Sequence, residues 1–533
     1  MVRYFFSIKL FFLLSLSCYS RSFDVVVYGA TPAGITAAIA ASREGKSVVI
    51  VEPLPLVGGI MSGGLSFSDS NQMARETLGG IFEEFHKRVE TEYINKGIKL
   101  PYQVSEKDTR PWTYEPHVAE KVFSEMLKEA SVLVVLNETL KSVDKKENYI
   151  VALNTYSKKR FSGKVFIDAS YEGDLLAAAK VGYRVGREGR DEYDESLAGA
   201  TYPKDIVSVS ATNDKNVALP LISGNQKAPE GQGDCRIMTY SFRLCLSADP
   251  NNQIPFRKPK NYDPGLYELF RRFYKSFPET RVLFDMYPIP GNKFDGNNGI
   301  GLQLSMGLVG ENWKYPEATP DRRIAIWKLH KDYTEGLLCF LMTDSAVPEH
   351  IRNQMKKLGY AKDEFQASDH FPPVLYVREG RRMVGDYVLT QADILENIEK
   401  PDPIGIGSFP IDSHDCQRIA ISSDSFVNEG TIFPVHIKNR EIGQPYQIPY
   451  QSITPKEIEC ANLLVPVCLS ASHVAFSSVR VEPAWMVLGE SAGIAASLAI
   501  DGKTSVQKVN YKQLAKKLKE RGQILELPNK IIQ

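Results

Sequence analysis

The sequence predicts an α/β fold in which a Rossmann-type domain is assembled from both chain ends and carries an inserted mixed α+β domain. A β-branched run at 25–27 ends at Gly29 and is followed by an alanine-rich stretch and a second apolar run at 48–51, the order of a βαβ unit. Another glycine- and alanine-rich stretch lies at 489–496, near the C-terminus. The region between them, 186–447, is rich in Pro, Gly, Asn and aromatic residues and shows no further strand–glycine–helix unit. Helices are expected in it at 321–341 and 349–357, where apolar residues recur at helical spacing. Most of the chain is therefore expected to be an insertion into one domain.

The first βαβ unit has the spacing of a dinucleotide-binding turn. Gly29 permits a tight turn after the first strand, and Gly34 lets the following helix lie close to the sheet. The N–H groups and the positive dipole end of that helix then face a pyrophosphate. Gly45 is expected to end the helix. The expected cofactor-binding residues of this turn are Gly29, Thr31, Pro32, Ala33 and Gly34.

Two side chains define how closely this unit follows the usual pattern. Thr31 stands where the pattern has a glycine, so its side chain must point away from the phosphates or donate its hydroxyl to one of them. Glu52 ends the second strand, where a carboxylate accepts hydrogen bonds from a ribose 2′-hydroxyl and repels a 2′-phosphate. An ordinary βαβ unit with a glycine turn is the alternative, and it leaves Glu52 unexplained.

Further motifs accompany this unit: the pair Gly58-Gly59, Phe-Ile-Asp-Ala-Ser-Tyr-Glu-Gly-Asp-Leu at 166–175, Tyr-Val-Arg-Glu-Gly-Arg-Arg-Met at 376–383, and the segment 470–486. Together they resemble the exported FAD-dependent oxidoreductases of the glutathione-reductase structural class, some of which carry a xanthan lyase label. The resemblance covers nearly the whole mature chain. It implies FAD as the cofactor and an oxidoreductase activity.

The resemblance also implies further cofactor contacts. Gly58 and Gly59 follow the ribose-binding acid, and Asp168 ends a strand that touches the dinucleotide from the opposite side. A plain strand-to-helix cap is the alternative for Asp168. A helix starting at Gly489 would aim its N-terminus at the flavin, where negative charge develops on reduction, although small residues for tight packing explain the same segment. The expected contacts in that helix are Gly489, Glu490 and Gly493.

Three residues are candidates for the chemistry. His473 lies between the last strand and the C-terminal helix, and an imidazole titrates where a general base is useful; a histidine bonded to nearby backbone is the alternative. Arg382 belongs to an arginine cluster suited to orienting a carboxylate, or to a salt-bridged face. Arg480 is the third candidate, with pairing to Glu482 as its structural alternative. Arg236, Tyr240 and Arg243 form a weaker set.

Composition and charge narrow the class of protein and its partners. The chain has 533 residues, of which 43% are hydrophobic and 24% charged, as expected for a large soluble enzyme. Lys and Arg total 64 and so do Asp and Glu, so charge gives no reason to expect nucleic acid or an anionic membrane as partner. The cysteines show no C-x-x-C spacing, which excludes a redox disulfide of that type and an iron–sulfur ligand run, while one or two structural disulfides stay open. The scattered histidines indicate that no metal is bound.

The first residues predict export. A basic start, a short apolar core at 10–18 and small residues after it are typical of a secretory signal peptide, and the core is too short for a membrane span. The protein is expected in the periplasm or outside the cell. Lipid attachment at Cys18 is an alternative, although Ser15 stands where a lipoprotein signal prefers leucine.

These observations combine into one expected organisation and activity. The expected parts are a signal peptide at 1–22, an FAD-binding domain at 23–185 and 448–505, a substrate or cap domain at 186–447, and a helical tail at 506–533. We expect hydride transfer from a small polar substrate, such as a sugar or polyol, to the flavin. Because no second dinucleotide unit is seen, electrons are expected to pass to an external acceptor rather than to come from NAD(P)H. An NAD-dependent dehydrogenase and a non-redox polysaccharide lyase or binding protein are the alternatives.

Overall fold

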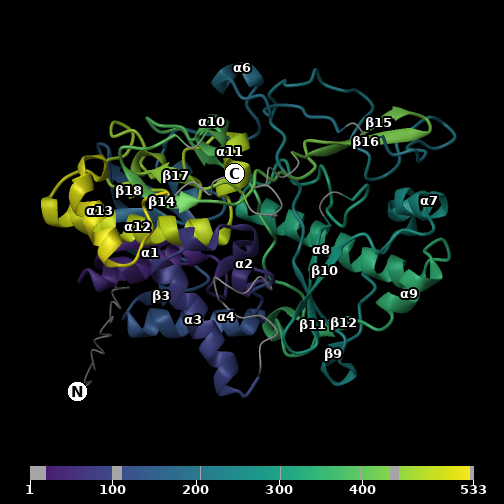
Figure 1. Ribbon diagram of the computed structural model, residues 1–533, viewed down its shortest axis with the longest axis horizontal. Coiled ribbons are helices and arrows are strands. Elements are labelled where there is room, and N and C mark those ends of the chain that lie inside the picture. Colours follow the sequence, from purple (N-terminus) through teal and green to yellow (C-terminus); the bar gives the residue numbers. More distant parts are fainter. Residues whose placement is uncertain are drawn as a thin grey trace, which may run out of the picture.

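The computed structural model describes residues 20–98, 111–203, 206–299, 302–396, 398–432 and 443–527. The expected signal peptide therefore lies almost wholly outside the described residues, and so does Cys18. Strand β1 (Ser20–Tyr28) begins within the last three residues of that peptide. Elements from both chain ends gather on one side of the molecule, and the middle of the chain forms the other side (Figure 1).

The side built from both chain ends contains a seven-stranded sheet in the order β3-β2-β1-β6-β5-β4, with β18 pairing with β6. The strands β3, β2, β1, β6 and β18 run parallel, whereas β5 and β4 are antiparallel additions. The bounds are β2 (Val48–Val51), β3 (Leu133–Val135), β4 (Leu140–Lys146), β5 (Tyr149–Thr155), β6 (Arg160–Asp168) and β18 (Leu463–Leu464). The apolar runs expected to be strands at 25–27 and 48–51 are central strands of this sheet, buried on both faces.

Two helices from opposite chain ends pack on each other against this sheet. Helix α1 (Pro32–Arg43) follows β1, and Glu44 and Gly45 end it, Gly45 with a φ of +77°. Helix α12 spans Glu482–Gly502, so the expectation that this helix starts at Gly489 is wrong by about two turns. Pro483 is accommodated in the first turn, where its missing N–H costs no hydrogen bond.

The other helices of this side cover the sheet and its edges. They include α2 (Gly59–Ser62), α3 (Gly80–Asn95), α4 (Pro116–Glu129), α5 (Asp174–Ala178), α10 (Gln391–Leu395), α11 (His473–Val479) and α13 (Tyr511–Glu520). A first hydrophobic core joins residues 25–198 with residues 383–525. The chain therefore returns to the first core from Met383 onward.

The middle of the chain forms a second core around an antiparallel sheet in the order β10-β11-β8-β12-β9. Its strands are β8 (Leu244–Ser247), β9 (Gln253–Ile254), β10 (Asp285–Ile289), β11 (Lys293–Asn297) and β12 (Gly359–Ala361). Helices α7 (Glu268–Ser276), α8 (Pro320–Thr343) and α9 (Glu349–Met355) accompany it, and the last two confirm the helices expected at 321–341 and 349–357. Short pairs complete the fold: β7 (Tyr183–Arg184) with β13 (Arg382–Met383), β14 (Pro403–Gly407) with β17 (Tyr446–Pro449), and β15 (Gln417–Ser422) with β16 (Ser425–Glu429).

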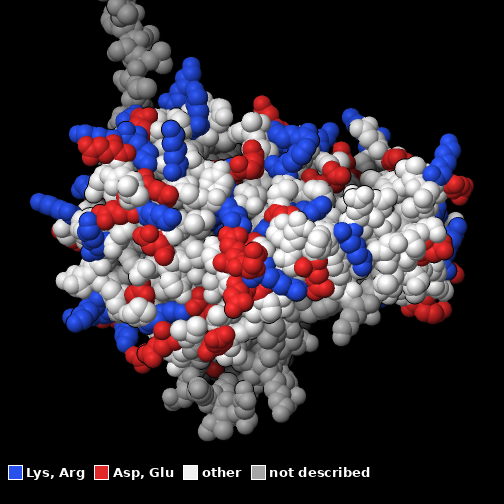
Figure 2. All heavy atoms as spheres, turned by 90° about the horizontal axis from the view of Figure 1, so that it is seen from above, with Lys and Arg blue, Asp and Glu red and all other residues white. Residues whose placement is uncertain are grey.

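The outer surface of the protein carries charged side chains of both signs. Basic and acidic side chains are interspersed over the face seen in Figure 2. Within the described part of the chain, α12 has the length and hydropathy of a membrane span, but 89% of its apolar stretch is buried inside the protein.

The six described cysteines are unpaired, so the disulfides left open by the sequence do not form among them.

Candidate functional site

A cavity of about 530 Å³ opens at the carboxyl edge of the parallel strands. Tyr28 is the last residue of β1 and Gly29 follows it, Glu52 follows β2, and Ser170 lies two residues after β6; all four line the cavity. Ligands of open α/β sheets bind at this edge because the strand ends and the helix N-termini meet there. The volume lies within the usual range of small-molecule and cofactor sites.

The glycine turn beside this cavity is shaped by close backbone contacts. Gly29 has a φ of +102°, and a Cβ placed on it would lie 2.8 Å from the carbonyl carbon of Ala169. A Cβ on Gly34 would lie 3.0 Å from Cβ of Ala169 and would also collide with the Gly29 carbonyl. The expected reasons for both glycines, a tight turn and close packing of helix and sheet, are confirmed.

Thr31 has a definite role in place of the usual glycine. Its hydroxyl donates to the carbonyl oxygen of Ala169 at 2.8 Å and accepts from the N–H of Gly34 at 3.2 Å, so it caps α1 and ties the turn to β6. Pro32 occupies the first helical position, and Ala33 packs towards α12. Thr31 and Gly29 line the cavity, whereas Pro32, Ala33 and Gly34 are not among its lining residues.

Glu52 faces the cavity with its carboxylate fixed by the backbone. It accepts hydrogen bonds from Ala30 N–H at 2.5 Å and Leu54 N–H at 2.7 Å. Burial raises the pKa of Glu52 to about 8, although both N–H groups favour its ionised form. A ribose diol donating to this carboxylate would favour ionisation further.

The opposite wall of the cavity comes from the segment after β6 and from the inserted region. Ser170 and Tyr171 line it beside Arg381 and Arg323, which both pair with Asp174. These guanidiniums sit where negatively charged phosphates would find partners. Asp168 lies behind this wall, because its carboxylate accepts from Ser170 N–H, Ser170 Oγ and Leu176 N–H instead of lining the cavity. The structure thus gives Asp168 the capping geometry that was its alternative.

The Gly58-Gly59 pair leads from the cavity toward the inserted region. Gly58 has a φ of +93° and donates its N–H to the Ala30 carbonyl at 2.8 Å. Gly59 lines the cavity, and a Cβ there would collide with the Tyr171 hydroxyl. Tyr171 accepts from Ile60 N–H at 3.0 Å and donates to Glu482 Oε1 at 2.5 Å, which joins this wall to the start of α12. Arg480 forms no pair with Glu482, so the expected Arg480–Glu482 pairing is wrong.

A buried polar cluster lies next to this wall, and its main members are Asp69, Arg243, Arg378, Asp412 and Arg480. Burial raises the pKa of Asp69 to about 6 and that of Asp412 to about 7. Burial lowers the pKa of Arg378 to about 9, which leaves it charged at neutral pH. We call this group the arginine cluster.

Two further side chains border the arginine cluster. Burial, with the charges of Arg378 and Arg480, lowers the pKa of His414 well below its ordinary value, so its ring is neutral at neutral pH. Burial raises the pKa of Tyr376 to about 12. Asp69, Asp412 and His414 escaped the sequence analysis because no local motif marks them, and Arg243 was only a weak candidate. They come together only through the fold.

His473 and Arg382 lie in a different, closed ion-pair network. His473 Nδ1 lies 2.8 Å from Glu379 Oε1, and its backbone N–H donates to Glu188. Arg382 pairs with Glu188 and Glu379 and donates to the carbonyls of Gly186 and Ala471. These contacts show the salt-bridged arrangement that was the alternative for Arg382. The catalytic role of His473 stays a prediction.

The glycines of α12 contact α1 instead of the cavity. A Cβ on Gly489 would lie 2.8 Å from the Ala33 carbonyl carbon, and one on Gly493 would lie 2.9 Å from Ala40 Cβ. Glu490 accepts from Ile81 N–H and from Gln523, each at 2.8 Å, and so holds the start of α3. None of these three residues lines the cavity, so the structure supports the tight-packing reading of this segment.

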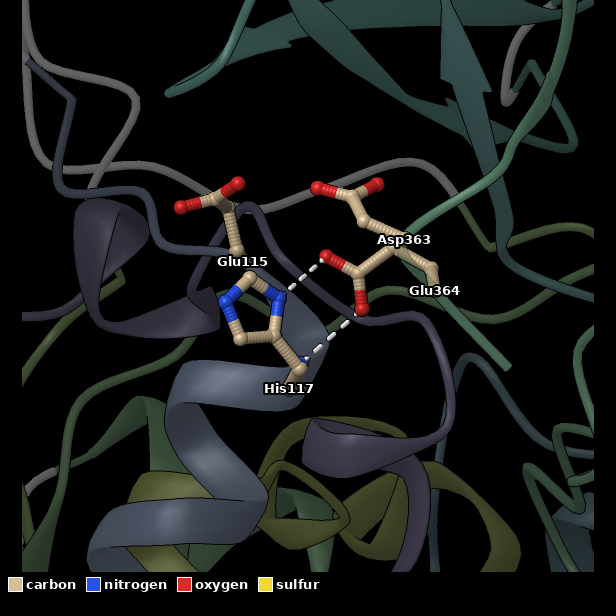
Figure 3. Close-up of side chains that lie close together, drawn as sticks. All are labelled: Glu115, His117, Asp363 and Glu364. Atoms are coloured by element: carbon tan, nitrogen blue, oxygen red, sulfur yellow. Dashed lines mark hydrogen bonds and ion pairs between the residues drawn. The ribbon is translucent and has the colours of Figure 1, made fainter. Parts of the chain in front are cut away.

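One group of side chains has the spacing of metal ligands. Ligand atoms of Glu115, His117, Asp363 and Glu364 lie within 4.8 Å of one another (Figure 3). The ammonium of Lys293 lies 2.6 Å from Glu115, 2.9 Å from Asp363 and 2.7 Å from Glu364. Lys293 therefore supplies the positive charge that these carboxylates need, and the group ties α4 to the inserted sheet.

The glycine turn, the carboxylate at the second strand and the cavity at the strand ends define a dinucleotide-binding α/β protein. Residues 24–518 match the family of FAD dependent oxidoreductases, and the chain belongs to this family. It is thus an oxidoreductase with FAD as cofactor. The residues present fit that group, because Glu52 offers an acceptor to a ribose and the α1 N-terminus, Arg323 and Arg381 offer positive potential to phosphates.

Solved structures show only distant likeness. A geranylgeranyl bacteriochlorophyll reductase-like protein from Thermoplasma acidophilum aligns over 95% of this chain and 85% of its own, at 11% identity and a TM-score of 0.36. The OxyS anhydrotetracycline hydroxylase from Streptomyces rimosus aligns over 52% of this chain and 44% of its own, at 10% identity and a TM-score of 0.28. NikD, an unusual amino acid oxidase, aligns over 31% of this chain and 56% of its own, at 15% identity and a TM-score of 0.23. The chain thus spans less than half of the hydroxylase. No curated protein matches it.

Proposed function

We propose that this protein is an exported FAD-dependent oxidoreductase that oxidises a small polar organic molecule at a C–H bond next to oxygen or nitrogen and passes the electrons to an external acceptor. The observation that carries the proposal is the adjacency of two sites. Tyr171 lines the cofactor cavity, donates to Glu482 and packs with Tyr376, and Tyr376 in turn lies against Arg378 of the arginine cluster.

The two sites divide the work of binding. Gly29, Thr31 and Glu52 hold the adenosine and pyrophosphate end of the cofactor, with Gly59 and Tyr171 farther along the cavity. When bound, FAD supplies an acceptor for two electrons and a proton. The buried, water-poor surroundings of the arginine cluster strengthen every electrostatic contact made there, which suits the orientation of a polar substrate.

The choice of an external acceptor rests on the glycine-bearing strand β14. This strand pairs with β17 and is followed by β15, with no helix between β14 and β15 in the described chain. This arrangement lacks the strand–turn–helix geometry that binds a nicotinamide dinucleotide. Reduction by the organic substrate itself is therefore favoured over reduction by NAD(P)H.

Export is proposed from the N-terminal sequence alone. A basic residue at position 3, an apolar core at 10–18 and small residues before Phe23 support a cleaved signal peptide. N-terminal sequencing of the secreted protein tests this. A mature chain that starts at Met1 and stays inside the cell would contradict it.

The redox proposal is tested on the purified protein. We expect a yellow protein whose flavin bands bleach with dithionite and which releases FAD on denaturation. Anaerobic bleaching is then followed with NADH, with NADPH, and with a panel of hydroxy acids, sugars, polyols and amines. Bleaching by one member of the organic panel supports the proposal. Rapid bleaching by NADH or NADPH alone would overturn the external-acceptor assignment.

A further inference from the structure

Two guanidinium groups of the arginine cluster are buried without a salt-bridge partner among the residues that the structure describes. Arg378 is 1% exposed; it donates to the Thr239 carbonyl at 2.8 Å, to Ser241 Oγ at 2.9 Å and to Asn298 Oδ1 at 3.3 Å, and its Nε has no partner. Arg480 is 3% exposed; it donates to the Asp412 backbone carbonyl at 2.9 Å, and its Nε also has no partner. Neither forms a salt bridge in the described part of the chain.

The neighbouring Arg243, by contrast, has a carboxylate partner. It binds Asp295 through two nitrogens, at 2.9 and 2.5 Å. Although burial opposes its charged form, Asp295 raises the pKa of Arg243 above its ordinary value. Asp295 is itself held by the N–H groups of Ser66 and Phe67, at 2.9 and 2.8 Å. Both oxygens of Asp295 thus bind Arg243, and Asp295 forms no hydrogen bond with Arg378 or Arg480.

Asp69 and Asp412 are close enough to interact with these arginines electrostatically but do not pair with them. Asp69 Oδ2 and Asp412 Oδ1 are buried without a hydrogen-bond partner among the described residues. Burying a charge without a partner costs several kcal/mol. Two incompletely bonded guanidinium groups thus lie near two incompletely bonded carboxyl groups. This arrangement points to a ligand that would supply the missing hydrogen bonds.

The arginine cluster adjoins the cofactor cavity through direct contacts. The guanidinium carbon of Arg378 lies 4.5 Å from the centre of the Tyr376 ring. Tyr376 packs in one apolar cluster with Ile60 and Val374, and Val374 lines the cavity. On the same side, the chain after Gly59 approaches Arg243 so closely that a Cβ on Gly64 would collide with its backbone. A molecule in the cluster would therefore lie beside the cofactor.

We propose that Arg378 and Arg480 bind a carboxylate group of the substrate, so that the enzyme acts on small acids such as hydroxy acids or sugar acids rather than on neutral sugars or polyols. This inference rests on the proposed redox function and names its substrate class. Guanidinium groups bind carboxylates through charge-assisted hydrogen bonds, which fix orientation as well as position. A neutral polyol would leave both cations unpaired. Arg418, a residue of β15, is also buried without a hydrogen-bond partner for its guanidinium, but neither it nor the neighbouring Tyr333 lines the cavity, so the same argument does not extend to it.

The binding part of the proposal is tested with unreactive probes on the FAD-loaded protein. Acetate, propionate and benzoate are compared with their primary amides at pH 6, by thermal unfolding and by the shift of the flavin absorption bands. We expect the carboxylates to raise the unfolding temperature and perturb the flavin, and the amides to do neither. Inorganic phosphate and chloride at equal ionic strength show whether any anion suffices. Equal effects of amides and carboxylates, or no effect of any carboxylate, would overturn the proposal.

Variants then assign the effect to the two arginines. Arg480→Met and Arg378→Lys should weaken carboxylate binding by about 10- to 100-fold, the loss expected for a charge-assisted hydrogen bond, while FAD content stays unchanged. Arg480→Lys is a second variant in case the methionine variant does not fold. Arg281→Met is the matched control, because Arg281 pairs with Asp285 at the surface. Unchanged carboxylate affinity in the cluster variants would refute the assignment.

A reduction assay separates this inference from the proposed function. Gluconate is compared with glucose, and lactate with 1,2-propanediol, for anaerobic bleaching of the flavin. Bleaching by an acid but not by its neutral partner supports both proposals. Bleaching by the neutral partners alone leaves the proposed function standing and refutes the carboxylate site. A protein that holds no FAD would refute the proposed function itself.

Discussion

Adding a methyl group at Gly489 or Gly493 should force α1 and α12 apart. A Cβ at Gly489 would lie 2.8 Å from the Ala33 carbonyl carbon and closer still to the oxygen, and a Cβ at Gly493 would lie 2.9 Å from Ala40 Cβ. Carbon atoms pack at about 3.5–4.0 Å, so the helices must separate by roughly 1 Å. All these neighbours are backbone or short side chains in the core, which cannot turn aside.

The expected cost follows from this overpacking. Inserting a methyl group into a closely packed core costs about 1–3 kcal/mol, from which a small helix-propensity gain of up to about 1 kcal/mol for Gly→Ala is subtracted. For a large domain each kcal/mol lowers the unfolding temperature by about 2–4 °C. We expect Gly489→Ala and Gly493→Ala each to lower it by a few degrees.

The assay is thermal unfolding of the FAD-loaded and FAD-depleted proteins in parallel. Because the two glycines contact α1 and not the cavity, the loss should be similar in both forms. Gly502→Ala is the matched control in the same helix, since a Cβ there meets only Thr504 at an ordinary 3.5 Å. A loss confined to the FAD-loaded form would refute the packing argument and restore these glycines as cofactor contacts.

Four further outcomes are expected. Glu52→Gln should weaken FAD binding by about 10- to 100-fold, because a carboxylate that the ribose hydroxyls help to ionise is replaced by a neutral amide. Titration of the FAD-depleted protein by flavin fluorescence measures this, and unchanged affinity contradicts it. Carboxylate binding should weaken from pH 6 to 8. The raised pKa values of Asp69 and Asp412 are about 6 and about 7, so both carboxyl groups lose their protons over this range and then compete with the ligand for the arginines. An affinity that does not change with pH refutes this. Lys293→Met should lower the free energy of unfolding by about 3–5 kcal/mol, because it leaves buried carboxylates unpaired. In urea unfolding, Ca²⁺ or Zn²⁺ should restore part of this loss, and an unchanged unfolding midpoint contradicts the prediction. His473→Asn should keep the flavin spectrum and slow reduction by the substrate if His473 takes part in the chemistry; unchanged reduction kinetics remove it from the mechanism.

The stability of the FAD-depleted protein should depend on pH through the titration of buried carboxyl groups. The folded pKa of Asp412 is about 7, above the ordinary 3.8, so its protonated form is the one that folding favours. Its contribution to stability is thus fully present below about pH 4 and is lost as pH rises through 7. Glu52 acts in the same direction with a pKa of about 8.

Local patterns in the sequence were enough to find the cofactor half of the site. The β-branched runs, the glycine turn and Glu52 lie within one short stretch, and each follows from backbone sterics or from strand alternation. The helices at α8 and α9 were also predicted, because their apolar residues recur at helical spacing. These features depend on neighbours in the chain, so a sequence contains them directly.

The arginine motif at 378–382 shows where local reasoning stops. Its arginines separate into different surroundings: Arg378 enters the arginine cluster, Arg381 lines the cavity, and Arg382 joins the network of Glu188 and Glu379. The sequence shows that guanidinium groups are present, but one main partner of each, Thr239, Asp174 and Glu188 in turn, lies more than a hundred residues away. A pattern of spacing has no information about such partners.

The sequence by itself determined the cofactor class, the order of the first βαβ unit and the membership of both chain ends in one glycine-rich framework. Only the tertiary structure decided that Gly489 and Gly493 serve helix packing and that Asp168 caps a turn. It also decided that Arg378 and Arg480 are buried near the cavity wall without a salt-bridge partner among the described residues. The physical reason is the range of the interactions. Turns, strands and caps are set by contacts along the chain, whereas burial of a charge and the pairing of buried groups depend on which distant segments the folded core brings together.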